Sequence, residues 1–145
     1  MELRIDRRMA YVQENSEYYL PKFAAMDSGG KKTSWNWAAF FFTDAWMLYR
    51  KMYKLFVITL IVQFIIATIF PGLSILIHIV VGLFGNYLYK DHVDKLAETG
   101  SLLTGVEKES HAAKHGGTSQ IAIAVYLILS LILAVLDSVL GMIIS

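Results

Sequence analysis

Residues 34–53 read SWNWAAFFFTDAWMLYRKMY, and this stretch decides how the rest of the chain is interpreted. It contains all three tryptophans and ends in a basic pair just before a long apolar run. On a helix, Asn36, Thr43 and Arg50 recur every seven residues and share one face, while aromatic and apolar side chains cover most of the rest. We therefore predict an amphipathic aromatic helix over residues 35–54.

The aromatic content of this helix predicts where it lies. Tryptophan and tyrosine favour the boundary between lipid headgroups and hydrocarbon, and neighbouring cations favour anionic lipid. We expect an in-plane or shallowly re-entrant helix at the cytoplasmic face. Its cations, with Lys90 and Lys95, either anchor the topology or form a headgroup site at the base of the next two helices. The expected interfacial residues are Trp35, Trp37, Trp46, Tyr49, Arg50, Lys51 and Lys54.

Uncharged segments follow the aromatic helix. Leu55–Phe70 and Leu73–Tyr89 are separated by Pro71-Gly72, which leaves no room for a soluble excursion, so residues 55–89 predict a transmembrane hairpin. A third run fills residues 121–145 and contains Asp137 as its one charged residue. The fold class is therefore an all-α integral membrane protein with three transmembrane helices and an N-terminal interfacial aromatic helix.

Composition agrees with this class. The chain has 145 residues, of which 56% are apolar and only 17% charged. The net charge of +1 gives no indication of a nucleic-acid partner, no basic cluster is dense enough to suggest one, and none is expected. The absence of cysteine excludes disulfides, thiolate metal sites and thiol nucleophiles. The N-terminus lacks the apolar core of a signal peptide, so we expect membrane targeting to depend on the internal apolar segments.

The charges also predict the topology. All 13 lysines and arginines lie in residues 1–54 and 90–114. The positive-inside rule then places the N-terminal segment, residues 1–34, and the amphipathic helix and loop, residues 90–120, in the cytoplasm, with the C-terminus outside. A bilayer with anionic headgroups is the expected environment.

Each predicted span carries a stripe of small or polar residues. Such stripes let helices approach closely and hydrogen-bond to one another, either within a three-helix bundle or between copies. The expected packing residues are Thr59, Ala67, Gly82, Gly85, Asn86, Ser130, Ala134 and Gly141.

Three polar side chains in these stripes have similar expected depths. Gln63, His78 and Asp137 all fall in the outer half of the membrane. A lone carboxylate there is costly, so Asp137 needs a partner or a water-filled cavity. We hypothesise that Asp137 pairs with His78 and that Gln63 joins them. This cluster would serve either as packing contacts or as a proton or ion path.

The sequence offers little support for an enzyme. It contains no nucleophile elbow, phosphate loop or dinucleotide fingerprint, and no cofactor is expected. Glu107, His111 and His115 recur every four residues on a predicted helix and are a weak metal candidate. A fourth ligand is lacking, and a solvated helix face explains the spacing equally simply. No catalytic residue is assigned.

The segments SWNWAAFFF and WMLYRKMY, preceded by NSEYYLPKF and followed by GNYLY and GGTS, resemble the bacterial membrane-protein family called domain of unknown function 2628. The resemblance covers residues 15 to about 120. Family members commonly have a glycine-proline pair after the aromatic run, where this chain has Thr43-Asp44. The resemblance implies a small bacterial inner-membrane protein and supplies neither an activity nor catalytic residues.

We therefore expect a non-enzymatic membrane subunit that packs against partner membrane proteins or its own copies. The alternative is an oligomeric channel or ion-translocating unit that uses Asp137, His78 and Gln63. A further alternative is an immunity or phage-exclusion protein.

Overall fold

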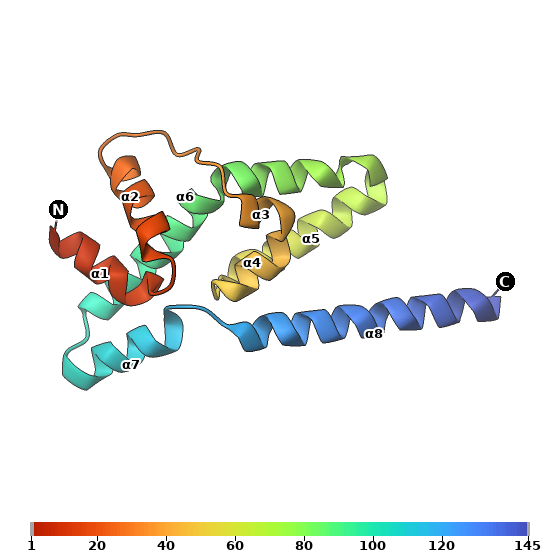
Figure 1. Ribbon diagram of the computed structural model, residues 1–145. Coiled ribbons are helices and arrows are strands. Elements are labelled where there is room, and N and C mark those ends of the chain that lie inside the picture. Colours follow the sequence, from red (N-terminus) through yellow and green to blue (C-terminus); the bar gives the residue numbers. More distant parts are fainter. Residues whose placement is uncertain (1, 145) are drawn as a thin grey trace.

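The computed structural model describes residues 2–144, and every regular element in that range is helical, which confirms the all-α prediction (Figure 1). In chain order the elements are α1 (Glu2–Val12), α2 (Ser16–Asp27), α3 (Trp37–Phe41), α4 (Thr43–Tyr49), α5 (Tyr53–Ile69), the 3₁₀ turn η1 (Pro71–Leu73), α6 (Ser74–Ser101), α7 (Gly105–His115) and α8 (Gln120–Ile144).

Helix α6 is the element around which the others pack. Its 28 residues run without a break from the apolar hairpin into the charged segment, so the second expected span and the amphipathic helix after it are one helix. Buried residues recur every three or four positions along its whole length, which is the spacing of a single helix face. That face contacts α3 and α4 along its apolar half and α1, α2 and α7 along its charged half.

The arrangement separates charged from apolar helices. Figure 1 shows α1, α2 and α7 gathered at one end, while the α5–α6 hairpin and α8 extend the other way. The hairpin turn and the C-terminal end of α8 lie on the same side. This arrangement agrees with the segregation of basic residues along the sequence, because the basic segments 1–34 and 90–114 both lie away from the hairpin turn.

The aromatic stretch is two short helices, and the prediction of one helix over 35–54 was wrong. Asn36 begins α3, since its side-chain oxygen accepts the backbone N–H of Ala39 at 3.0 Å. At Phe42 the backbone leaves helical geometry, with φ −125° and ψ 44°, and α4 then starts in a new direction. The bend allows both α3 and α4 to pack against α6, which a straight helix of this length could do only over part of its surface.

The structure also yields fewer candidate spans than the three predicted. Within residues 2–144, only one helix is long and apolar enough to cross a membrane by length and composition, and it contains α8. Helix α5 is apolar but has 17 residues. Helix α6 is long enough, but His78, Asn86 and Lys90 interrupt its apolar sequence. These polar residues contact other helices, and the pattern of apolar segments along the sequence does not reveal those contacts.

Candidate functional site

The α3–α4 pair packs closely against two glycines of α6. A Cβ atom added at Gly82 would lie 2.9 Å from the Phe40 Cβ, and one at Gly85 would lie 2.9 Å from the Ala39 Cβ. The backbone N–H of Asn36 donates to the carbonyl of Gly82 at 2.8 Å. The expected packing residues Gly82, Gly85 and Asn86 are therefore buried, but they receive the aromatic pair and not another long helix.

A buried amide pair fixes this contact. The Asn36 side chain donates to the side-chain oxygen of Asn86 at 2.9 Å, and the Asn86 amide nitrogen donates to the Ser34 carbonyl at 3.1 Å. Both asparagines are at most 2% exposed. Because buried amides are costly when unpaired, these bonds restrict how the segment before α3 meets α6.

The α3–α4 pair enters and returns along α6. Asn36 lies beside Gly82 and Asn86, the bend at Phe40 and Thr43 contacts His78, and Trp46 returns to the level of Gly85 and Tyr89. The Nδ1 atom of His78 is 2.9 Å from the Phe40 carbonyl, which can only accept, so Nδ1 carries the proton of this bond. The α3–α4 pair therefore folds back on itself along one face of α6.

A polar cluster joins four helices near the bend. Gln63 of α5 donates to one oxygen of Asp44 at 3.3 Å, and the Tyr126 hydroxyl of α8 approaches the other at 3.5 Å. The Nδ1 atom of His78 in α6 lies 3.1 Å from the hydroxyl of Thr43, the residue before Asp44. We call Asp44, Gln63, His78 and Tyr126 the Asp44 cluster. Gln63 and His78 were expected together with Asp137. The structure instead joins Gln63 to Asp44, and His78 to Thr43 and the Phe40 carbonyl.

Asp137 lies elsewhere. It is exposed on α8, and no hydrogen bond or ion pair joins it to His78 or Gln63 within the part of the chain described. The packing residues Ser130, Ala134 and Gly141 are also exposed on α8, and a Cβ added at Gly141 would meet nothing within 4 Å. In the hairpin, Thr59 is buried whereas Ala67 is exposed.

Arg50 is a buried structural cation and not a surface residue. Its guanidinium lies 4.6 Å from the ring centre of Tyr19, 5.0 Å from that of Tyr89 and 5.4 Å from that of Tyr49. It donates to the carbonyl of Glu14 at 3.0 Å and to the Tyr89 hydroxyl at 3.3 Å. With 2% exposure, Arg50 cannot contact headgroups, so its assignment as an interfacial residue was wrong.

The other expected interfacial residues divide between the interior and the surface. Trp46 is 5% exposed and donates to the Tyr19 hydroxyl, and the Tyr49 hydroxyl donates to Glu14 at 2.6 Å. Lys51, with a left-handed φ of 56°, donates to the Gly116 carbonyl at 2.6 Å. Trp37 and Lys54 are exposed, while Trp35 is half-buried. Of the expected interfacial aromatic residues, Trp37 of α3 is exposed, Trp35 and Tyr49 are half-buried, and Trp46 is buried.

An ionic network ties the N-terminal helices to α6. Arg8, 3% exposed, contacts Asp94 and Asp27 at 2.6 Å each, and Lys90 contacts the same two carboxylates at 2.8 Å. Partial burial alone would raise the pKa of the Asp27 carboxyl. The hydrogen bonds and charges of Arg8 and Lys90 outweigh burial and lower this pKa from 3.8 to about 2. The i,i+4 spacing of Lys90 and Asp94 was the only sequence signal for this network.

The weak metal candidate is not assembled. His111 pairs with the Tyr11 hydroxyl at 2.9 Å, and its ring lies 4.7 Å from that of His115. Glu107 does not join them, and no set of three histidine, aspartate or glutamate side chains suited to a metal ion occurs among the described residues. His111 instead joins α7 to α1.

The fold and these contacts define a class: a helical protein with a charged three-helix end, an apolar hairpin holding a folded-back aromatic pair, and one helix long enough to cross a membrane. The chain belongs to the family described as Protein of unknown function (DUF2628), whose model matches residues 8–95. That range covers α2–α5 completely, most of α6 and less than half of α1, so it contains the aromatic pair and the part of α6 against which the pair packs. No curated protein and no solved structure matches the chain.

Proposed function

We propose that this chain is a non-enzymatic membrane subunit that binds another membrane protein through the length of α8. In this proposal α5, the apolar half of α6 and α8 lie in the bilayer, and α1, α2 and α7 lie in the cytoplasm. The observation that carries it is Asp137, an exposed carboxylate in a helix that has no other charged side chain. A carboxylate at such a depth needs a partner, and no described residue of this chain supplies one.

The polar face of α8 continues an existing contact. Tyr126, Ser130, Asp137 and Gly141 follow spacings of four or seven residues and share one face of the helix. At Tyr126 this face contacts α4 and α5, through Asp44 and through the ring of Phe56. Beyond Tyr126 the helix runs apart from the hairpin, as Figure 1 shows, so the face remains open to another helix.

The charge on this face favours a particular kind of partner. Two ionised Asp137 carboxylates brought together by self-association would repel each other. A transmembrane helix with a basic or hydrogen-bond-donating side chain would satisfy Asp137 and pack against Ser130, Ala134 and Gly141, which allow close approach. A partner of different sequence therefore fits better than a second copy.

Site-specific photo-crosslinking in native membranes tests this proposal. A photoreactive residue at Ala134, on the polar face, should give one crosslinked product with a distinct membrane protein. The same residue at Ile132, on the opposite face, should give little of that product. Asp137→Leu should abolish the crosslink and Asp137→Asn should retain part of it. Equal products at both positions, or a product containing only this chain, would contradict the proposal.

A second candidate, ion or proton transfer, is favoured by the Asp44 cluster. It gathers a carboxylate, an amide, an imidazole and a phenol from four helices, α4, α5, α6 and α8. Purified protein in liposomes would then conduct protons or cations, and Asp44→Asn would reduce the flux at least tenfold. Asp137→Asn serves as the control, because Asp137 lies outside the cluster. Equal flux in the wild-type chain and Asp44→Asn would exclude this function.

A further inference from the structure

An apolar groove runs between the two arms of the hairpin. Its volume is about 360 Å³, within the usual range of ligand sites. Thr59 is the one polar residue that lines it. The other lining residues are Ile58, Val62 and Ile66 of α5, and Leu76, Ile77, Val80, Val81 and Leu88 of α6. Such a groove suits a flexible hydrocarbon chain.

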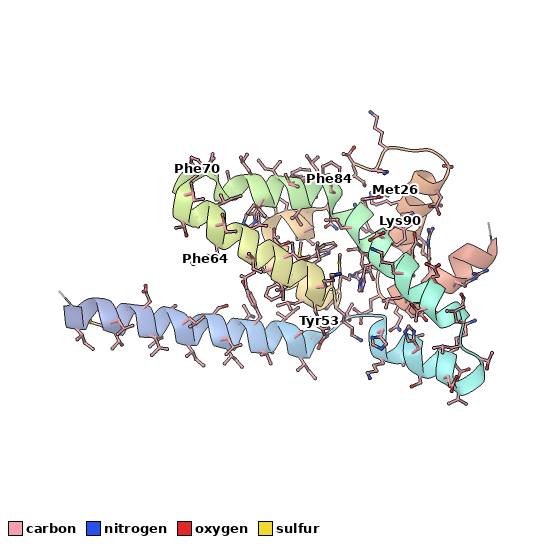
Figure 2. All side chains as sticks on the ribbon, turned by 180° about the vertical axis from the view of Figure 1, so that it is seen from behind. Met26, Tyr53, Phe64, Phe70, Phe84 and Lys90 are labelled. Atoms are coloured by element: carbon pink, nitrogen blue, oxygen red, sulfur yellow. The ribbon has the colours of Figure 1, made fainter. Side chains whose placement is uncertain are left out.

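A second, basic cleft adjoins the groove at the charged end of the hairpin. It has a volume of about 480 Å³ and shares Ile58 and Leu88 with the groove. In Figure 2, which shows the hairpin from behind, Tyr53 marks the end where this cleft lies and Phe70 marks the opposite end. The polar residues that line it are Lys51, Tyr53, Lys54, Asp91, His92 and Lys95.

The charges of the cleft favour an anion. Three lysines face one carboxylate, and Lys95 pairs with that carboxylate, Asp91, at 2.6 Å. Lys51 lines the cleft as well, and its Nζ donates to the carbonyls of Lys114 and Gly116. Lys54 is exposed and makes no hydrogen bond or ion pair with any described residue. A ligand phosphate near Lys54 would therefore displace no existing contact.

An unpaired nitrogen in the cleft supports the same conclusion. The Nε2 atom of His92 is buried and has no hydrogen-bond partner among the described residues. A buried ring nitrogen without a partner is unusual and costs free energy. With the proton of the ring on Nε2, a side-chain rotation that opens this atom to the cleft would let it donate to a phosphate oxygen.

We propose that the groove and the cleft together bind one anionic glycerophospholipid. The phosphate lies beside Lys54 and His92, and one acyl chain extends between α5 and α6 toward Val62 and Val80. From the charged end of the hairpin toward its turn, the basic cleft comes first and the apolar groove second. Headgroup and hydrocarbon follow the same order from the surface of a leaflet to its interior. The proposal rests on the membrane placement of the hairpin and is independent of what α8 binds.

Lipid titration of the full chain in a neutral detergent tests the proposal. Native mass spectrometry would measure binding of dioleoylphosphatidylglycerol, dioleoylphosphatidylcholine and glycerol phosphate. We expect the first to bind with a Kd at least tenfold below that of the second, and glycerol phosphate alone not to bind. Equal affinity for the two lipids would overturn the assignment of an anionic headgroup. Saturable binding of glycerol phosphate would overturn the assignment of a lipid.

Matched variants separate the two parts of the site. Lys54→Ala should raise the Kd for phosphatidylglycerol about fivefold, and Lys31→Ala, an exposed lysine elsewhere, should leave it unchanged. Val62→Trp should fill the groove and raise the Kd at least tenfold, whereas Val57→Trp, exposed on α5 outside the groove, should not. Unchanged affinity in Lys54→Ala or Val62→Trp overturns the corresponding contact. Crosslinking from α8 is measured separately, so either proposal can fail without the other.

Discussion

The guanidinium carbon of Arg50 lies 5.0 Å from the centre of the Tyr89 ring, and an Arg50 nitrogen donates to the Tyr89 hydroxyl at 3.3 Å. This contact joins the end of the aromatic pair to the middle of α6. Because Arg50 also donates to the carbonyl of Glu14, the same side chain ties the α1–α2 connection to α6.

Replacing Arg50 should destabilise the whole chain. We expect Arg50→Ala to lower the free energy of unfolding by about 2–4 kcal/mol, since it removes cation–π contacts and hydrogen bonds from a charged donor. Arg50→Lys should recover only part of this loss, because an ammonium cannot reproduce the planar guanidinium contacts. Denaturant unfolding in micelles would measure both variants. A loss of less than 0.5 kcal/mol would contradict the structural role.

The close packing of α3 against α6 should leave no room for a side chain at position 85. Gly85→Ala places a methyl group 2.9 Å from the Ala39 Cβ, so we expect a loss of about 1–3 kcal/mol from overpacking. Gly141→Ala is the matched control, because a Cβ there meets nothing within 4 Å. In thermal unfolding, the melting temperature of Gly85→Ala should lie clearly below that of Gly141→Ala. Similar melting temperatures would show that α3 does not pack against this glycine.

Acid should weaken the contact between α1, α2 and α6. The folded-state pKa of Asp27 is about 2, below its ordinary value of 3.8, so folding favours the ionised form. This contribution is fully present above about pH 4–5, and it is lost as the pH falls toward 2. After allowance for solvent screening we expect it to be about 1–2 kcal/mol.

Asp27→Asn should therefore lower stability at pH 7 by that amount and have little effect near pH 2. Asp91→Asn is the control, because its pair with Lys95 is largely exposed and should contribute little at any pH. Unfolding measured from pH 2 to 7 would show the difference. A constant gap between Asp27→Asn and the wild-type chain across this range would contradict the prediction.

The proposed topology predicts opposite labelling of two introduced cysteines. The natural chain has none, so Gly72→Cys and Lys108→Cys can each be labelled uniquely. A membrane-impermeant maleimide should label residue 72, in the hairpin turn, in sealed cells. The same reagent should label residue 108, in α7, only after the cells are permeabilised. Labelling of residue 108 in sealed cells would reverse the assignment of the cytoplasmic side.

Sequence patterns located most elements but not the partners of their polar residues. Gln63 and His78 were expected near a carboxylate. The membrane depths expected from the helical rise favoured Asp137 over Asp44, because the aromatic stretch was assumed to remain at the interface. The stripe of Gly82, Gly85 and Asn86 was recognised as a packing face, but its occupant is α3. Residue spacing along one helix identifies a face, and it does not identify which other helix meets that face.

The sequence by itself determined the helical class, the tight turn at Pro71-Gly72, the family and the segregation of basic from apolar segments. These properties follow from local propensity and composition, which each segment carries alone. Only the tertiary structure decided that the aromatic stretch bends at Phe42, that Arg50 is enclosed by three tyrosines and that Gln63 bonds to Asp44 and not to Asp137. Each of these depends on contacts between residues far apart in the chain, and their energies are set by burial and partner geometry.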